Sequence, residues 1–131
     1  MSSAKRRNRT DFDRWLVEQF AETGAFTTLV VLVDINGNRV TPLRSTHFNV
    51  IGTEIDWAEL STLFMQTGED WDGVSFFPLA ASDDELLDNQ TAQMKLRELE
   101  ARLDEDRLVL NEGHFFDKWG RRMRIDEVQV Q

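Results

Sequence analysis

The segment from His114 to Arg124 combines aromatic and basic side chains more closely than the rest of the chain. Its candidate interaction residues are Phe115, Phe116, Lys118, Trp119, Arg121, Arg122 and Arg124. Aromatic rings beside guanidinium groups can stack on nucleic-acid bases and hold phosphates, and they can also anchor a protein interface. A third interpretation is a hairpin whose aromatic residues enter the core while its arginines pair with acidic residues of a long helix. The excess of acid earlier in the chain favours this third interpretation.

Three carboxylates stand close together in the loop before Gly73, at Glu69, Asp70 and Asp72. Clustered oxygens are the ligands that calcium and magnesium prefer, so these residues are the candidates for a metal site. The loop lacks the later bidentate glutamate of an EF-hand, and acidic residues before a strand are typical of solvated turns. We therefore expect no bound metal here.

Catalytic signatures are scarce. The two histidines, His47 and His114, are too few for a zinc site, and the chain has no cysteine. His114 lies between Glu112 and Asp117, which could orient it as a general base. No G-x-S-x-G elbow, G-x-G-x-x-G turn or P-loop supplies a nucleophile or a phosphate cradle. The sequence thus predicts no cofactor, and more readily a binding protein than an enzyme.

Charge is sorted into blocks along the chain. Residues 1–14 have a balance of +3, residues 54–112 carry sixteen acids against four bases, and the whole chain has a net charge of −9. Such a surface repels nucleic acid and anionic membranes and attracts basic partners or copies of itself. The first hypothesis is therefore a non-enzymatic protein-binding or regulatory module. The alternatives are a metal-dependent small hydrolase or ligand-binding enzyme that uses Asp70, Asp72 or His114, and a nucleic-acid-associated protein or DNA mimic.

The composition is that of a globular domain, with 40% hydrophobic and 10% aromatic residues. The longest apolar run, 29–33, is too short to span a bilayer, and no apolar stretch follows the basic residues at the N-terminus. The sequence therefore predicts a cytoplasmic protein that does not bind membranes. We expect a flexible basic arm at residues 1–10 and a single domain over residues 11–131.

Several helices and strands must position these candidates. Thr10 and Asp13 predict a capping box for a helix that ends near Gly24. The run 26–34 predicts a strand buried on both faces, and Asn36-Gly37 predicts a hairpin turn. The returning strand, 38–44, contains Pro42, which indicates a sheet edge or a bulge. A third strand is expected at 47–51.

The second half of the chain predicts two more helices and several strands. One short helix opens near Asp56, with a core face formed by Trp57, Leu60, Leu63 and Phe64. A strand follows at 74–79, and a long acidic helix is expected over about 83–106, after the capping box 82–85. Strands are expected at 108–110, 114–116 and 122–130. This order predicts an α+β fold with a mainly antiparallel sheet and two to three packed helices.

The long helix carries an apolar seam with heptad-like spacing, formed by Ala92, Leu96, Leu99 and Leu103. Three helices compete for the two faces of one small sheet, because packed helices lie about 8–10 Å apart. If the other two helices cover the sheet, this seam would be left free and would pair two copies. A homodimer through the seam is therefore a further hypothesis.

Overall fold

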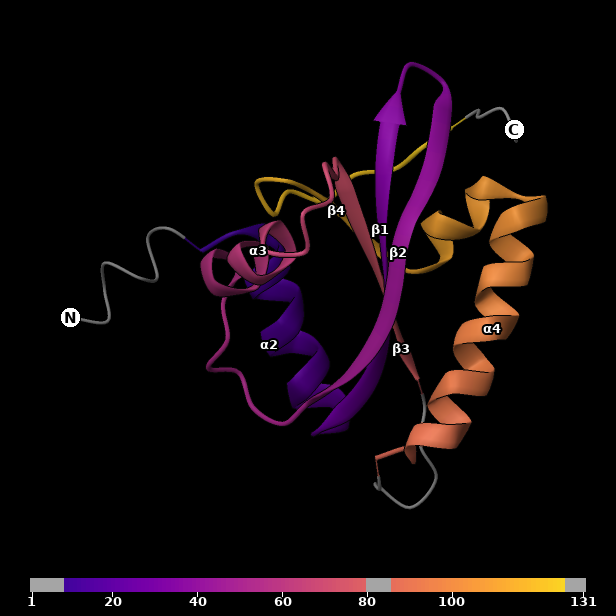
Figure 1. Ribbon diagram of the computed structural model, residues 1–131. Coiled ribbons are helices and arrows are strands. Elements are labelled where there is room, and N and C mark those ends of the chain that lie inside the picture. Colours follow the sequence, from indigo (N-terminus) through magenta and orange to yellow (C-terminus); the bar gives the residue numbers. More distant parts are fainter. Residues whose placement is uncertain (1–8, 80–85, 127–131) are drawn as a thin grey trace.

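The centre of the fold is the apolar strand β1 (Phe26–Asn36), whose first eight residues are all buried. In the computed structural model, β1 pairs antiparallel with β2 (Arg39–Val50) on one side and with β3 (Gly73–Leu79) on the other (Figure 1). The short strand β4 (His114–Asp117) extends the sheet beyond β3, giving the order β2-β1-β3-β4. The structure describes residues 9–79 and 86–126. This sheet, with its packed helices, confirms the predicted α+β fold.

The hairpin between β1 and β2 turns at Gly37 and Asn38, one residue later than predicted, because Asn36 still pairs with Arg39; Gly37 adopts a φ of 66°. β2 runs to Val50 without interruption, so the separate third strand expected at 47–51 is part of β2. The register shifts after Leu32, whose partner is Arg44, because the next residue of β1 pairs with Pro42 and Leu43 is left over. Proline cannot donate a backbone hydrogen bond, and a bulge on an edge strand accommodates it. The prediction for Pro42 is confirmed.

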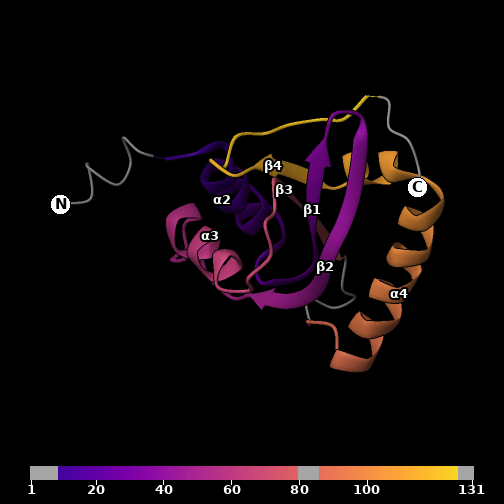
Figure 2. The ribbon, with the colours of Figure 1, turned by 45° about the horizontal axis from the view of Figure 1, so that its top comes forward.

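Helices α2 (Asp11–Thr23) and α3 (Trp57–Met65) cover one face of the sheet (Figure 2). The predicted capping box forms, because the Asp13 backbone N–H donates to Thr10 Oγ1 and the Thr10 backbone N–H donates to the Asp13 carboxylate. An aromatic core lies between these helices and the sheet. It includes Phe12, Trp15, Trp57, Phe64, Trp71, Phe76 and Phe116.

Helix α4 (Asn89–Glu105) covers the opposite face (Figure 2). Its seam residues Ala92, Leu96, Leu99 and Leu103 are buried, and the three leucines pack with Leu29, Val31 and Val33 of β1. The expectation that this seam is free to pair two copies is therefore corrected, since these side chains belong to the core of one chain. The physical reason is that α2 and α3 share one face and leave the other face open to α4.

The long helix is shorter than the predicted span of 83–106. It begins at Asn89, where the Asp88 carboxylate accepts from the Thr91 backbone N–H at 2.7 Å. The predicted capping box at residues 82–85 lies outside the described residues. From 89 to 105 the helix carries four acidic and three basic residues, so its own charge is nearly balanced.

A 3₁₀ helix, η2 (Arg107–Glu112), replaces the strand predicted at 108–110. The run Leu108–Leu110 is too short for its periodicity to distinguish a strand from a helical turn. The Asp106 carboxylate accepts from the Leu108 backbone N–H at 3.0 Å and starts the turn. The strand predicted at 122–130 is also wrong for its described part, where only Arg122 forms an isolated bridge, to Phe116.

Arg107, the first residue of η2, is buried beneath the end of α4. Its Nε donates to the Val40 carbonyl at 2.8 Å, and its Nη1 donates to the Leu103 carbonyl. The guanidinium thus links the edge strand β2 to the last turn of α4. Separately, none of the helices in residues 9–79 and 86–126 is long and apolar enough to cross a membrane.

Candidate interaction surface

The aromatic and basic segment divides between the core and the surface. Phe115 and Phe116 are both fully buried, on opposite faces of the sheet. Trp119, in contrast, has 64% of its surface exposed. The interpretation that the aromatic residues of this segment enter the core is therefore correct for the two phenylalanines and wrong for the tryptophan.

Trp119 lies on a turn that is held by a dense set of hydrogen bonds. Asp117 Oδ1 accepts from the backbone N–H groups of Trp119 at 2.9 Å and of Arg121 at 3.0 Å. The Gly120 backbone N–H donates to the Asp117 carbonyl at 3.0 Å, and Gly120 has a φ of 76°. A side chain exposed on such a turn has a fixed backbone beneath it.

The same turn is attached to both helices of its face. Trp57 Nε1 donates to the Lys118 carbonyl at 2.9 Å, and the Phe12 backbone N–H donates to the Gly120 carbonyl at 3.0 Å. The Arg122 backbone N–H also donates to the Asp11 carboxylate at 2.9 Å. The position of Trp119 is thus set by the starts of α2 and α3 as well as by its own turn.

The basic side chains of the segment have acidic neighbours close at hand. Arg121 pairs with Asp117 at 2.8 Å, and its guanidinium carbon lies 5.0 Å from the centre of the Trp119 ring. Arg124 pairs with Asp126 at 3.6 Å, and Lys118 lies 3.9 Å from Asp72. The expectation that the arginines pair with the long acidic helix is wrong. Arg121 pairs within the segment and Arg124 pairs two residues beyond it, which leaves less positive charge free for a phosphate.

Arg122 and His114 pack on the aromatic core rather than on a carboxylate pair. The Arg122 guanidinium carbon lies 5.0 Å from the centre of the Phe116 ring, and its Nη1 is 3.2 Å from His114 Nδ1. The His114 ring stacks on Trp15 at 4.7 Å. Burial and then the charge of Arg122 lower the pKa of His114. Glu112 pairs with Arg102 instead, so the flanking acids do not orient this imidazole as sequence reasoning allowed.

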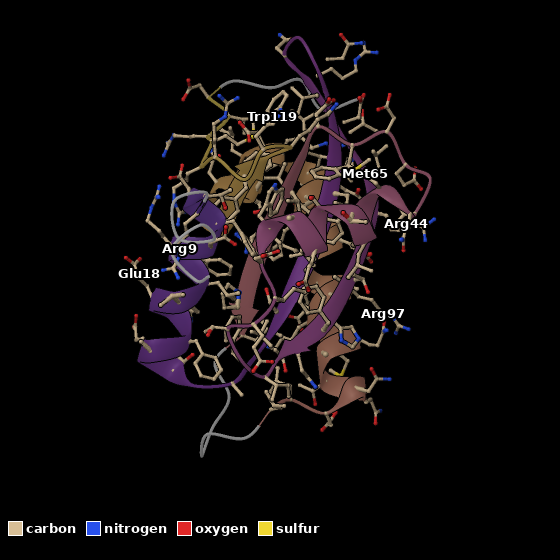
Figure 3. All side chains as sticks on the ribbon, turned by 90° about the vertical axis from the view of Figure 1, so that its left-hand side faces the viewer. Arg9, Glu18, Arg44, Met65, Arg97 and Trp119 are labelled. Atoms are coloured by element: carbon tan, nitrogen blue, oxygen red, sulfur yellow. The ribbon has the colours of Figure 1, made fainter. Side chains whose placement is uncertain are left out.

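A groove of about 380 Å³ lies between the end of α3 and Lys118. Its apolar lining comes from Met65, which is 68% exposed, and from Trp71, which is buried. Ser61 and Gly68 complete one wall, and Glu69 and Asp70 stand along it. Figure 3 shows Met65 and Trp119 on the same side of the molecule. Lys118, which lines the groove, is the residue before Trp119 in the chain.

Acidic side chains gather behind this groove. The Asp72 backbone N–H donates to the Val33 carbonyl at 2.8 Å, and Asp72 Oδ2 accepts from the Ile35 backbone N–H at 2.8 Å, so Asp72 is fixed against the end of β1. Hydrogen bonding with Asp72, together with partial burial and the charges of Asp72 and Asp70, raises the pKa of Asp34. Negative charge therefore accumulates at this point.

Two of the three residues considered for a metal site, Glu69 and Asp72, have other partners. Glu69 lies 3.3 Å from Arg44, and Asp72 binds the backbone of Ile35 and lies near Lys118. Within the part of the chain that the structure describes, no three histidine, aspartate or glutamate side chains come together in a way that could hold a metal ion.

Sequence reasoning missed the contribution of α3 to this surface. It placed Leu63 in the core, but Leu63 is 52% exposed, because the buried positions Trp57, Leu60 and Phe64 leave it on the side of the helix. Met65 and Trp71 were not singled out, although the sequence places Met65 one residue after Phe64 and Trp71 between two aspartates.

Comparison of the chain with models of protein families, with curated proteins and with solved structures gives no match in any of the three.

Proposed function

We propose that this chain is a non-enzymatic protein-binding module and that Trp119 anchors its partner. The observation that carries the proposal is a large aromatic side chain, 64% exposed, on a turn fixed by hydrogen bonds to Asp117 and to both helices. Tryptophan is among the residues most enriched at the centres of protein interfaces. A turn that is already ordered loses little further conformational entropy when a partner binds, so more of the contact energy appears as affinity.

The charge of the molecule supports a protein partner of basic character. A net charge of −9 increases the rate at which a positively charged protein meets this surface. The cation–π contact between Arg121 and Trp119 keeps the ring beside a charged group, as in many interfaces that mix apolar and charged contacts. These features suit binding better than they suit catalysis.

An unbiased library of displayed peptides tests the proposal. Peptides selected on the wild-type protein are titrated against wild type, Trp119→Ala and the control Met94→Ala. Met94 is a matched control because it is 54% exposed and lies on α4, across the sheet from Trp119. We expect Trp119→Ala to weaken binding by about 30-fold or more, as hot-spot residues do, and Met94→Ala to leave it unchanged. Selected peptides that bind Trp119→Ala as tightly as wild type would overturn the proposal.

A further inference from the structure

We propose that the groove beside Trp119 receives a short basic and apolar segment of a partner protein. An apolar side chain of that segment would lie between Met65 and Trp71, and an adjacent arginine or lysine would lie at Asp70, next to the ion pair of Glu69 with Arg44. The inference rests on the proposed function, and it adds the chemistry of the partner.

The apolar half of the groove combines a fixed floor with an adaptable wall. Trp71 packs edge-on against Trp57, with ring centres 6.1 Å apart, and against Phe64, with ring centres 5.7 Å apart. Met65 is unbranched and mostly exposed, so its side chain can adjust to the shape of an inserted group. The volume of about 380 Å³ is within the range of ligand pockets in proteins and accommodates one large apolar side chain.

The polar half selects a cation. Asp70 forms no ion pair with another residue in the ranges 9–79 and 86–126, and Lys118 lies no closer than 3.9 Å to Asp72. Asp70 and Asp72 also repel Asp34, because their negative charges raise the pKa of Asp34 in addition to its hydrogen bond with Asp72 and its partial burial. A partner's guanidinium or ammonium group at Asp70 would reduce this repulsion. An acidic segment would increase it.

The same charge argument disfavours a second copy of this chain as the occupant. Each copy carries a net charge of −9, so two copies repel each other at long range. A basic segment of a different protein meets no such barrier, and its apolar residue would cover Met65.

The test uses short synthetic peptides in which one leucine is flanked by arginines. Matched peptides replace the leucine with serine or the arginines with glutamate. Binding is followed by amide chemical shifts of the full chain, at low and at high salt. We expect saturable shifts centred on residues 61–71 and 118–119, binding that weakens as salt increases, and loss of binding for the glutamate peptide. The serine peptide should bind at least about tenfold more weakly.

Charge variants of the protein test the cation site separately. Asp70→Asn should lower the affinity for the arginine peptide by about two- to fivefold, which is the range for exposed ion pairs. Glu98→Gln is the control, because Glu98 is an exposed acid on α4 that pairs only loosely with Lys95, at 3.8 Å. Three results would each overturn the inference: the arginine and glutamate peptides bind equally, the chemical shifts change outside residues 61–71 and 118–119, or Asp70→Asn and Glu98→Gln bind the arginine peptide with equal affinity.

Further outcomes identify a different occupant. A concentration-dependent dimer in sedimentation that Met65→Glu abolishes would assign the groove to a second copy. A change in the amide chemical shifts of residues 61–71 in the free protein, when Lys5, Arg6 and Arg7 are replaced with serine, would assign the groove to the chain's own N-terminal segment. Either result overturns the inference. If the library peptides that depend on Trp119 are acidic, the proposed function stands and only this inference fails.

Discussion

Replacing Arg107 with methionine removes a guanidinium from the core and keeps most of its apolar stem. Arg107 is only 6% exposed, and its Nε donates to the Val40 carbonyl at 2.8 Å. Its Nη1 donates to the Leu103 carbonyl in the last turn of α4. In the variant, an edge strand and a helix end therefore lose a charged hydrogen-bond donor at the same time.

The size of the effect follows from these contacts. A hydrogen bond that involves a charged group contributes about 1.5–3 kcal/mol to stability, and a cation at a helix C-terminus adds about 0.3–1 kcal/mol. Methionine also removes the desolvation penalty of a buried cation, which offsets part of the loss. We expect Arg107→Met to lower the free energy of unfolding by about 2–4 kcal/mol. For a domain of this length, that corresponds to a fall in Tm of about 10 °C.

Urea unfolding followed by circular dichroism measures the loss, and an unchanged m-value shows that the folded state is otherwise the same. Arg102→Met is the matched control. The Arg102 guanidinium binds both oxygens of Glu112 at 2.8 Å, but both side chains are about half exposed. An exposed pair contributes less than about 1 kcal/mol. If Arg107→Met loses no more stability than Arg102→Met, the guanidinium does not hold α4 to β2 and the reasoning is wrong.

Two further predictions concern the turn at Gly120 and the half-buried imidazole of His114. Gly120→Ala should lower the free energy of unfolding by about 2–3 kcal/mol, because Gly120 has a positive φ and a Cβ there would lie 2.9 Å from Thr10 and Trp57. Gly68→Ala, where φ is also positive but no atom lies within 4 Å, should lose only about 1 kcal/mol in the same urea titration, and equal losses would refute the steric argument. The pKa of His114 is lowered, so the unfolded chain binds more protons than the folded one just below the ordinary value of 6.5. The free energy of unfolding should therefore decrease as the pH falls below about 6.5. His114→Phe should reduce this dependence on pH, while the control His47→Gln keeps it. An unchanged dependence in His114→Phe would contradict its assignment to His114.

The fold could be predicted from the sequence where one local signal dominated. The run 26–34 has no polar alternation, and Asn36-Gly37 marks a turn, so the central hairpin was predictable although its turn lies one residue later, at Gly37 and Asn38. The capping box at Thr10 and Asp13 likewise defined the start of α2. The prediction of secondary structure was wrong where a strand and a helical turn both fit the same pattern of apolar residues. Leu108–Leu110 buries apolar residues equally well as a strand or as a helical turn, and the Asp106 cap decided between them.

The candidate surface was predictable only in part, because it is assembled from segments far apart in the chain. Trp119 and Lys118 belong to a segment that the sequence marked. Met65, Trp71 and Asp34 come from a helix, a loop and a strand, and only the antiparallel pairing of β1 with β3 brings Asp34 beside Asp72. The seam on α4 shows a related limit. Its spacing indicates an apolar face, but the spacing alone does not say whether the sheet or a second chain covers that face.

The contacts between the start of α2 and residues 117–122 have a consequence for how the chain is made. Synthesis delivers α2 long before residues 117–122, yet the Phe12 backbone N–H donates to the Gly120 carbonyl and the Asp11 carboxylate accepts from the Arg122 backbone N–H. A nascent chain that ends before residue 117 can pair β1, β2 and β3, but it leaves the first turn of α2 and the indole N–H of Trp57 without their acceptors. Completion of the domain during translation therefore waits until residues 117–122 have been synthesised, because only then can α2 and α3 form these hydrogen bonds.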